Sequence, residues 1–265
     1  MDFKNKVVII TGASSGIGAA IALLFTKKGA KVVMVARNED RLKNVRSNCE
    51  KFGHQPLVIV ADVSKDSEAK RVINTTVSQY GRIDILVNSA GISKIAGIVD
   101  DNALKVFDEV MSVNLRSIVS LTHLATPHLI ASKGNIVNVS SIPDFGALAA
   151  RTFSYSTSKA ALDHFSKCVA FELAPEGVRC NTVNPRPVRT EVIAHTGVSK
   201  EEEDAIWKEI EKVTALGRVS DASEVAELIV FLASNKARGI TGSSFVTDNG
   251  SLLQGVSMST SFEFK

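Results

Sequence analysis

Three polar residues in the second half of the chain could together protonate a carbonyl oxygen. Tyr155 and Lys159 stand four residues apart at the start of a segment with helical periodicity, so both side chains would lie on one helix face. A free phenol ionises near pH ~10 and therefore needs a nearby cation that stabilises the phenolate at neutral pH. Lys159 would supply that cation, and the hydroxyl of Ser141 could polarise the carbonyl. Ser156 and Ser158 are expected to point away from this face.

A glycine-rich turn near the N-terminus suggests a site for a dinucleotide. Residues 11–18 read Thr-Gly-Ala-Ser-Ser-Gly-Ile-Gly, between an apolar run and a helical segment. Glycines permit close approach of the backbone to a pyrophosphate, whose charge the start of the helix favours. The spacing differs from the common Gly-x-Gly-x-x-Gly, and such a turn can also be a plain connection. The predicted cofactor contacts in this turn are Gly12, Ser14, Ser15, Gly16, Ile17 and Gly18.

The end of the next apolar run indicates which dinucleotide would bind. NAD is usually selected by an Asp or Glu that accepts hydrogen bonds from the ribose hydroxyls. Here the run ends in Ala36 and Arg37, and a guanidinium can bind a 2′-phosphate through charge-assisted hydrogen bonds. The sequence therefore favours NADP(H) over NAD(H). Arg37 could instead be a solvated charge and Glu39 could turn back to the ribose, although Asn38, Glu39 and Asp40 also make a good helix start.

These residues lie in an alternation of short apolar runs and longer helical segments, which is typical of a parallel sheet with crossover helices. Strands are expected at residues 7–11, 31–36, 57–61, 85–88, 135–139, 179–183 and 244–247. Helices are expected at residues 16–28, 39–52, 66–80, 102–130, 155–174, 199–212 and 223–233. The pattern predicts a single α/β domain over residues 1–265, with a Rossmann-type doubly wound parallel seven-stranded sheet. The charged helix at 199–212 belongs to a small insertion, about residues 190–215, which could cover a substrate pocket or simply be a solvated helix.

The composition excludes several classes of protein. Hydrophobic residues make up 45% and charged residues 22% of the 265 residues, which is typical of a soluble globular chain. The net charge of +3, without a long basic run, lacks the pattern of a nucleic-acid binder. No apolar run approaches the ~20 residues of a membrane helix. The three cysteines have no metal-ligand spacing, so we expect reduced thiols, no metal and a cytoplasmic location.

Further motifs accompany the glycine loop, Ser141 and the Tyr155–Lys159 pair. They are Asp62-Val63, Asn88-Ser89-Ala90-Gly91, Asn114, Asn184-Pro185 and Ile240-Thr241-Gly242. With these motifs the chain resembles the short-chain dehydrogenase/reductase family from about residue 6 to residue 255, and within it the 3-oxoacyl thioester reductase-like members. Shared folds carry many activities, so this kinship indicates the fold more than the substrate.

The resemblance implies a reaction and a role for each matching residue. NADPH would pass a hydride to a carbonyl, or the reverse reaction would oxidise an alcohol, with a catalytic proton relay through Asn114, Ser141, Tyr155 and Lys159. The implied cofactor contacts are Asp62 and Val63 at the adenine, Asn88, Ala90 and Gly91 along the ribose and nicotinamide, Tyr155 and Lys159, and Pro185, Val188 and Thr190 near the carboxamide and phosphate. Each also has a plain structural alternative: Asp62 can cap a turn, Asn114 can satisfy a bent helix and Val188 can pack. The resemblance further implies a homotetramer formed through the helices at 102–130 and 155–174 and the C-terminal strand.

Three positions depart from the family pattern. Ser89 replaces an Asn and should preserve the turn, because it is also small and polar. Asn249 replaces a Gly and should be tolerated, because Asn accepts left-handed geometry. Arg186 replaces a Gly, so the loop that carries it is expected to be strained, shifted or mobile if that position needs an unusual dihedral.

The substrate is expected to meet a mainly apolar set of loop residues. The predicted contacts are Ser141, Tyr155, Ile142, Phe145, Val192 and Ile193, with Asp144, Leu148, His195 and Trp207 as further candidates. This set favours a lipophilic ketone, aldehyde or secondary alcohol, although packing of these residues on one another is an equal alternative. Two rival functions stay open: an NAD-dependent alcohol dehydrogenase, and a catalytically silent nucleotide-binding protein, made conceivable by Arg186. The intact Ser141, Tyr155 and Lys159 argue against the second.

Overall fold

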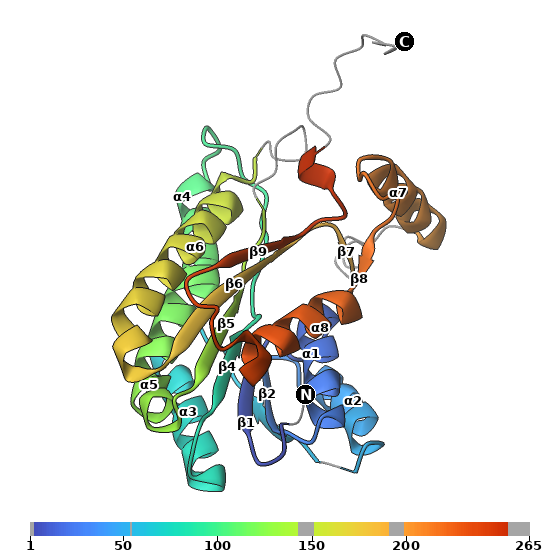
Figure 1. Cartoon of the computed structure of the whole chain (residues 1–265). Helices are drawn as coiled ribbons and strands as arrows, with labels where there is room; N and C mark the ends of the chain where they lie inside the picture. Colours follow the sequence, from blue (N-terminus) through green and yellow to red (C-terminus); the bar gives the residue numbers. More distant parts are fainter. Residues whose placement is uncertain (1–2, 54, 143–150, 191–198, 254–265) are drawn as a thin grey trace, which may run out of the picture.

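The computed structural model describes residues 3–53, 55–142, 151–190 and 199–253, which form a sheet covered by helices on both faces (Figure 1). The sheet has seven parallel strands in the order β3-β2-β1-β4-β5-β6-β9. They are β1 (Val7–Thr11), β2 (Lys31–Ala36), β3 (Leu57–Val60), β4 (Ile85–Asn88), β5 (Asn135–Val139), β6 (Arg179–Pro185) and β9 (Ser244–Thr247). All seven predicted strands are confirmed, and β6 extends to Pro185. The order reverses between β1 and β4, and such a switch point opens a crevice at the carboxyl ends of the strands.

The helices pack in two layers, one on each face of the sheet. They are α1 (Gly16–Lys27), α2 (Glu39–Glu50), α3 (Asp66–Tyr80), α4 (Ala103–Met111), α5 (Ser117–Ser132), α6 (Phe153–Leu173), α7 (Lys200–Lys212) and α8 (Ala222–Ala233), with short 3-10 turns η3 (Ala174–Glu176), η5 (Asn235–Ala237) and η6 (Ser251–Leu253). On one face α1 packs against α8, and on the other α3 packs against α5 and α4 against α6.

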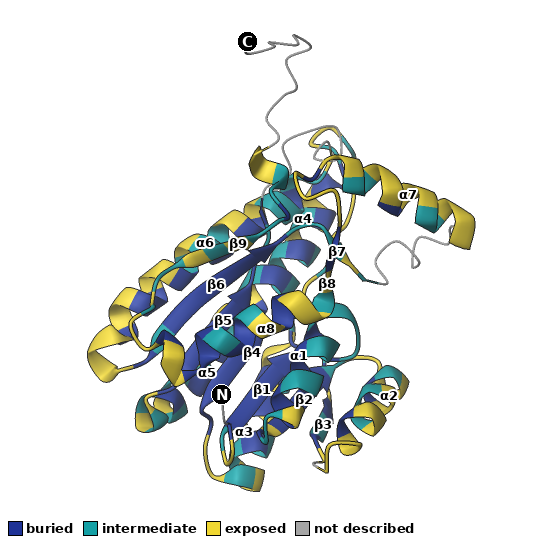
Figure 2. Cartoon of the chain, turned by 45° about the vertical axis from the view of Figure 1, so that its right-hand side comes forward, coloured by how far each residue is buried: buried dark blue, intermediate teal, exposed yellow. Residues whose placement is uncertain are grey.

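The strands are buried on both sides, as their continuous apolar sequence requires. In β1, Val8 and Ile10 contact the layer of α1 and α8, whereas Val7 and Ile9 contact the layer of α3 and α5. Figure 2 shows the sheet in the colour of buried residues, with exposed residues on the outer sides of the helices. This core holds the carboxyl ends of the strands at one edge.

The long helix predicted at 102–130 is interrupted by a π-helical turn, η1 (Ser112–Arg116), which joins α4 to α5. A π turn widens the helix by one residue per turn and so rotates the side chains that follow it. The buried Asn114 lies in this turn. The interruption therefore aims one polar side chain into the protein interior.

Helix α7 stands apart from the two layers, above the carboxyl ends of the strands (Figures 1 and 2). Ser199 and Glu202 form a capping box at its start, and Trp207 is its one buried residue. Two short strands that were not predicted, β7 (Val188–Arg189) and β8 (Ser220–Asp221), pair in parallel and flank the segment that contains α7. Among the described helices, each is too short or too polar to cross a lipid bilayer.

Candidate active site

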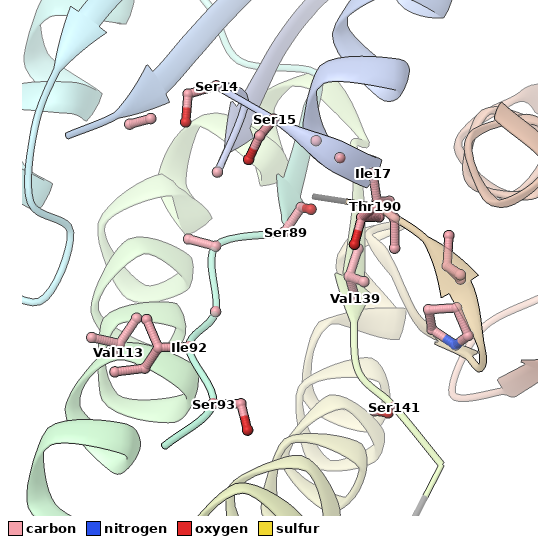
Figure 3. Close-up of a pocket in the computed structure, with 18 of the residues that line it drawn as sticks. Ser14, Ser15, Ile17, Ser89, Ile92, Ser93, Val113, Val139, Ser141 and Thr190 are labelled. Carbon is pink, nitrogen blue, oxygen red and sulfur yellow. The ribbon is translucent and has the colours of Figure 1, made fainter. Parts of the chain in front are cut away.

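A cavity of about 1020 Å³ lies at the carboxyl ends of the strands (Figure 3). It runs from the glycine loop after β1 to the residues that follow β5 and β6. In Figure 3, Ile92 and Val113 lie on one side of it and Ser141 on the other, while Thr190 approaches Ile17 at the start of α1. The cavity is lined by most of the residues predicted to bind the cofactor: Gly12, Ser14, Ser15, Gly16, Ile17, Gly18, Arg37, Asp62, Val63, Ala90, Gly91, Tyr155, Lys159, Pro185, Val188 and Thr190.

Two glycines of the loop, Gly12 and Gly18, have no room for a side chain. Gly12 has a φ of +69°, and a Cβ added there would lie 2.9 Å from the Cα atom of Ala90. A Cβ at Gly18 would lie 2.2 Å from the carbonyl oxygen of Gly12. Ser15 makes no side-chain cap at the start of α1, so the first N–H groups of the helix are left for an anion. This cradle fits the pyrophosphate of a dinucleotide.

Two guanidinium groups line the end of the cavity next to β2. One belongs to the predicted Arg37, just after β2, and the other to Arg41, in the first turn of α2. The N–H of Arg41 donates to the Oδ1 atom of Asn38, 3.0 Å away, as part of the helix cap. Arg41 was not among the predicted cofactor contacts. Glu39 lies in an ion pair of 2.8 Å with Lys43 and does not line the cavity.

Asp62 both caps a turn and lines the cavity. Its Oδ1 atom accepts hydrogen bonds from the Oγ atom of Ser64 at 2.7 Å and from the N–H of Ser64 at 3.1 Å. The bond from the Ser64 hydroxyl holds the pKa of Asp62 below its ordinary value, and the nearby Arg37 charge adds to this effect. Asp62 is therefore a fixed carboxylate acceptor after β3.

Lys159 is almost fully buried, 6% exposed, at the catalytic end of the cavity. Its Nζ atom donates to the carbonyl oxygen of Val139 at 2.8 Å and lies 5.7 Å from the centroid of the Tyr155 ring. Burial lowers the pKa of Lys159 to about 8, although Asp163 opposes the shift. At neutral pH the ammonium form still prevails, so a cation stands beside the phenol.

Asn114 lies behind the cavity wall and joins two of its sides. Its Oδ1 atom accepts from the N–H of Ile92 at 2.8 Å, and its Nδ2 atom donates to the carbonyl oxygen of Ile92 at 2.9 Å. Nδ2 also donates to the Oγ atom of Ser158 at 3.1 Å, and Ser158 in turn donates to the carbonyl oxygen of Tyr155 at 2.7 Å. The prediction that Ser158 points away from the catalytic residues is therefore wrong. Ser158 follows Tyr155 by three residues, so both residues lie on the same face of α6.

Gly91 lies against both Asn114 and Lys159 at the cavity wall. A Cβ added at Gly91 would lie 3.5 Å from the Oδ1 atom of Asn114 and 3.6 Å from the Nζ atom of Lys159. The glycine thus lets the backbone after β4 pass directly over both polar groups. A bound ligand can come correspondingly close to the lysine.

Several predicted residues do not line the cavity. Asn88 is buried in the sheet, where its Nδ2 atom donates to the Oδ1 atom of Asn138 at 2.8 Å, and it holds β4 to β5. Ile142 is buried and does not line the cavity either. Of the other candidate substrate contacts, Trp207 lines the cavity, whereas Asp144, Phe145, Leu148, Val192, Ile193 and His195 lie outside the described residues.

The loop with Arg186 is not strained by its arginine. Among the described residues, the non-glycine positions with positive φ are Asn5, Lys133, Arg151 and Asn249, so Arg186 adopts an ordinary backbone conformation. Its N–H donates to the carbonyl oxygen of Thr247 at 2.9 Å. The expectation of backbone strain at Arg186 is wrong. Asn249, with a φ of +51°, does take the left-handed geometry for which Asn is suited. Arg186 and Ile210 also line the cavity, which the sequence did not indicate.

Comparisons with known proteins agree with this arrangement. A family model described as enoyl-(acyl carrier protein) reductase matches residues 12–251. The 3-oxoacyl-(acyl-carrier-protein) reductase of Thermotoga maritima is 34% identical, over 94% of this chain and 99% of its own length. The 2-(R)-hydroxypropyl-CoM dehydrogenase of Xanthobacter autotrophicus is 33% identical, over 92% of this chain and 97% of its own length.

A solved structure gives the same result for the fold. It is a short-chain dehydrogenase/reductase of unknown function from Caenorhabditis elegans, determined with its cofactor. It shares 34% sequence identity with this chain at a TM-score of 0.87, and the match covers 95% of this chain and 96% of the other. With the glycine cradle and the Tyr155–Lys159 pair in place, this chain belongs to the short-chain dehydrogenase/reductase family of oxidoreductases.

Proposed function

We propose that this protein is an NADPH-dependent carbonyl reductase, which also oxidises the corresponding alcohol in reverse. One observation carries the proposal: a buried lysine lies 5.7 Å from the ring of Tyr155, in the same cavity that begins at the glycine cradle. A cation beside a phenol favours the phenolate and so makes the hydroxyl a proton donor near neutral pH.

NADPH, held in the cradle, would supply a hydride to the carbonyl carbon. Tyr155 donates its phenolic proton to the carbonyl oxygen, so that the C=O group becomes CH–OH. The hydroxyl of Ser141, which also lines the cavity, donates a hydrogen bond to the same oxygen and holds it near Tyr155. The ammonium of Lys159 stabilises the phenolate that remains. Asn114 fixes the backbone around Ile92 and, through Ser158, the backbone of Tyr155.

Two features support NADPH rather than NADH. Arg37 and Arg41 both line the cavity beside the end of β2, where the ribose of the adenosine would lie. Glu39, the carboxylate that could have turned back to the ribose, is engaged by Lys43. Two guanidinium groups suit a 2′-phosphate, which they can bind through charge-assisted hydrogen bonds.

The apolar part of the cavity lining supports a substrate with an apolar body. It includes Ile92, Val113, Trp207 and Ile210, and the last two come from α7. Trp207 is held by a bond of 3.2 Å from its Nε1 atom to Glu203 and by the guanidinium of Arg189, 5.3 Å from its ring. We therefore propose that α7 is the lid of the substrate pocket.

We further propose a cytoplasmic homotetramer. Leu104 of α4 and Phe171 of α6 are 77% and 88% exposed, and these two helices pack side by side. Val246 is exposed on β9, the edge strand of the sheet. Apolar side chains in such positions are suited to contacts between subunits. The free thiols of Cys49, Cys168 and Cys180 fit a reducing compartment.

A screen of NADPH oxidation with ketosteroids, isoprenoid aldehydes, acyl thioesters, quinones and sugars tests the proposal. With any accepted carbonyl, Tyr155→Phe should lower kcat by roughly a hundred- to ten-thousandfold, since it removes the acid, and should leave the Kd for NADPH unchanged. Retention of activity in this variant would overturn the role of Tyr155. Tight NADPH binding without oxidation by any carbonyl would instead support the silent nucleotide-binding protein.

A further inference from the structure

We propose that Asp163 is a positioning residue of the active site, which holds Ser141 through Asn184 and stabilises the ammonium of Lys159 from the next turn of α6. The inference rests on the proposed reductase function, because it assigns a role to a residue next to the same catalytic groups. Asp163 and Asn184 do not line the cavity, so their effect on the reaction passes through Ser141 and Lys159.

Asn184 connects Asp163 to the segment that follows β5. The Nδ2 atom of Asn184 donates to the Oδ2 atom of Asp163 at 2.8 Å and to the carbonyl oxygen of Ser141 at 3.2 Å. Asn184 itself is 3% exposed and lies in β6, where it pairs with Val246 of β9. One amide group, fixed in the sheet, therefore binds both the carboxylate and the backbone of Ser141.

Ser141 depends on this contact because it lies beyond the end of its strand. The pairing of β5 with β6 ends at Val139 and Val183, and the N–H of Ser140 makes the next bond, to the carbonyl oxygen of Val183 at 2.8 Å. The carbonyl oxygen of Ser141 is then held by Asn184. The Ser141 hydroxyl must reach the oxygen of the substrate, so a shift of this backbone would misplace a catalytic group.

Asp163 also acts on the charge of Lys159. The two residues stand four apart in α6, so their side chains share one face of the helix. Burial lowers the pKa of Lys159 to about 8, and the negative charge of Asp163 acts in the opposite direction. The carboxylate thus keeps more of Lys159 protonated at a given pH than burial alone would allow.

The other titratable groups on the elements that pack against α6 are engaged elsewhere or lie at the surface. They are Lys105, Asp108 and Glu109 of α4, Arg116 of η1, Arg179 and Cys180 of β6 and Glu176 of η3. Glu109 and Arg116 form ion pairs with Lys94 and Asp66, and Arg179 donates to backbone carbonyls. Burial raises the pKa of the Cys180 thiol to about 12, so it is neutral. The remaining three are exposed. On α6 itself, Tyr155 faces Lys159, and Asp163 supplies the opposite charge.

Two oxygens of this contact accept no hydrogen bond from the described residues. They are the Oδ1 atoms of Asp163 and Asn184, and both are buried. A buried acceptor without a donor lowers the stability of a fold, and such exceptions are typical of functional sites. A pair of residues that served the fold alone would not be expected to leave these atoms unpaired.

Asp163→Asn separates the charge from the hydrogen bond, because it keeps an oxygen that can accept from Asn184. Loss of the negative charge lowers the pKa of Lys159, so the fall of kcat/KM at high pH should begin about one pH unit lower than in the native protein. The temperature of thermal unfolding should be unchanged or higher, because an unpaired carboxylate oxygen is removed. Glu172→Gln removes a carboxylate from an exposed position of α6 and should leave the pH profile in place.

Asn184→Ala tests the contact with Ser141. It keeps the charge of Asp163 and removes the donor, so kcat should fall roughly ten- to a hundredfold, with the pH profile and the Kd for NADPH unchanged. Asp163→Ala removes both the charge and the acceptor and should show both effects. A native pH profile in Asp163→Asn would overturn the role toward Lys159, and a native kcat in Asn184→Ala would overturn the role toward Ser141.

A measurement without turnover separates this inference from the reductase function. In protein that carries lysine labelled at Cε with a stable carbon isotope, the Lys159 resonance is followed by NMR as the pH rises, and Lys159→Arg assigns it by its loss. The midpoint of its titration should lie near pH 8 in the native protein and about one unit lower in Asp163→Asn. This shift would support the electrostatic role of Asp163 even if no carbonyl oxidises NADPH. Equal midpoints would overturn that role, whatever the enzyme turns over.

Discussion

The Nζ atom of Lys159 lies 5.7 Å from the centroid of the Tyr155 ring while it donates a hydrogen bond to the carbonyl oxygen of Val139. The ammonium is thus held in the protein interior by a backbone group and faces the phenol across a short gap. Burial disfavours its charged form and lowers its pKa to about 8 from the ordinary 10.5. The charge that activates Tyr155 is therefore lost at a lower pH than that of a surface lysine.

The first prediction concerns the pH dependence of catalysis. As the pH rises through about 8, Lys159 releases its proton and no longer stabilises the phenolate. We expect kcat/KM for NADPH, which reports on the free enzyme, to be level below that pH and to fall about tenfold per pH unit above it. Lys159→Arg keeps its charge at high pH, so its lower activity should show no break near pH 8. The same break in this variant would assign the titration to another group.

The second prediction concerns Ser158, which positions Tyr155. Its hydroxyl accepts from Asn114 and donates to the carbonyl oxygen of Tyr155 at 2.7 Å. Ser158→Ala should destabilise the fold by about 1 kcal/mol and lower kcat several-fold, with the Kd for NADPH unchanged. Stopped-flow kinetics and thermal unfolding measure the two effects. Ser156→Ala makes the same chemical change on the same helix outside this contact, and equal kinetics in both variants would show that Ser158 has no positioning role.

The sequence was sufficient to predict the strands and the residues of the glycine loop, because both depend on local patterns. A strand buried on both faces must be apolar at successive positions, and β1 shows this from Val7 to Ile10. Gly12 and Gly18 are required because a Cβ at either position would clash with neighbouring backbone atoms, so the motif itself indicates the cradle. Tyr155 and Lys159 follow from helical spacing in the same way.

Other parts of the site depend on contacts between distant segments. The π turn that carries Asn114 inserts one extra residue per turn, and no change in periodicity between 102 and 130 marks it. Arg186, just after β6, and Ile210, in α7, line the same cavity although they lie far apart in the sequence, which local patterns do not reveal. The expected strain at Arg186 was inferred from a residue type, whereas the strand pairing of Pro185 with Thr247 gives that position an ordinary conformation.

The third prediction concerns cofactor choice. Arg37→Asp removes one guanidinium and adds a carboxylate that can accept bonds from ribose hydroxyls, so NADPH should bind on the order of 10- to 100-fold more weakly and NADH more tightly. Fluorescence titration with both cofactors measures the change. Arg46→Asp makes the same charge change farther along α2, outside the cavity lining, and should leave both affinities unchanged. If the native protein already prefers NADH, the NAD-dependent alternative is correct.

The fourth prediction concerns assembly. Phe171 is 88% exposed near the C-terminal end of α6, and a charge placed there would be buried without a partner in an interface formed by this helix. The native protein should show the mass of four chains of 28.3 kDa in light scattering, and Phe171→Glu should show a smaller species. Phe52→Glu adds the same charge at another partly exposed phenylalanine, after α2, and should keep the native mass. A native monomer, or an unchanged mass in Phe171→Glu, would remove α6 from the subunit interface.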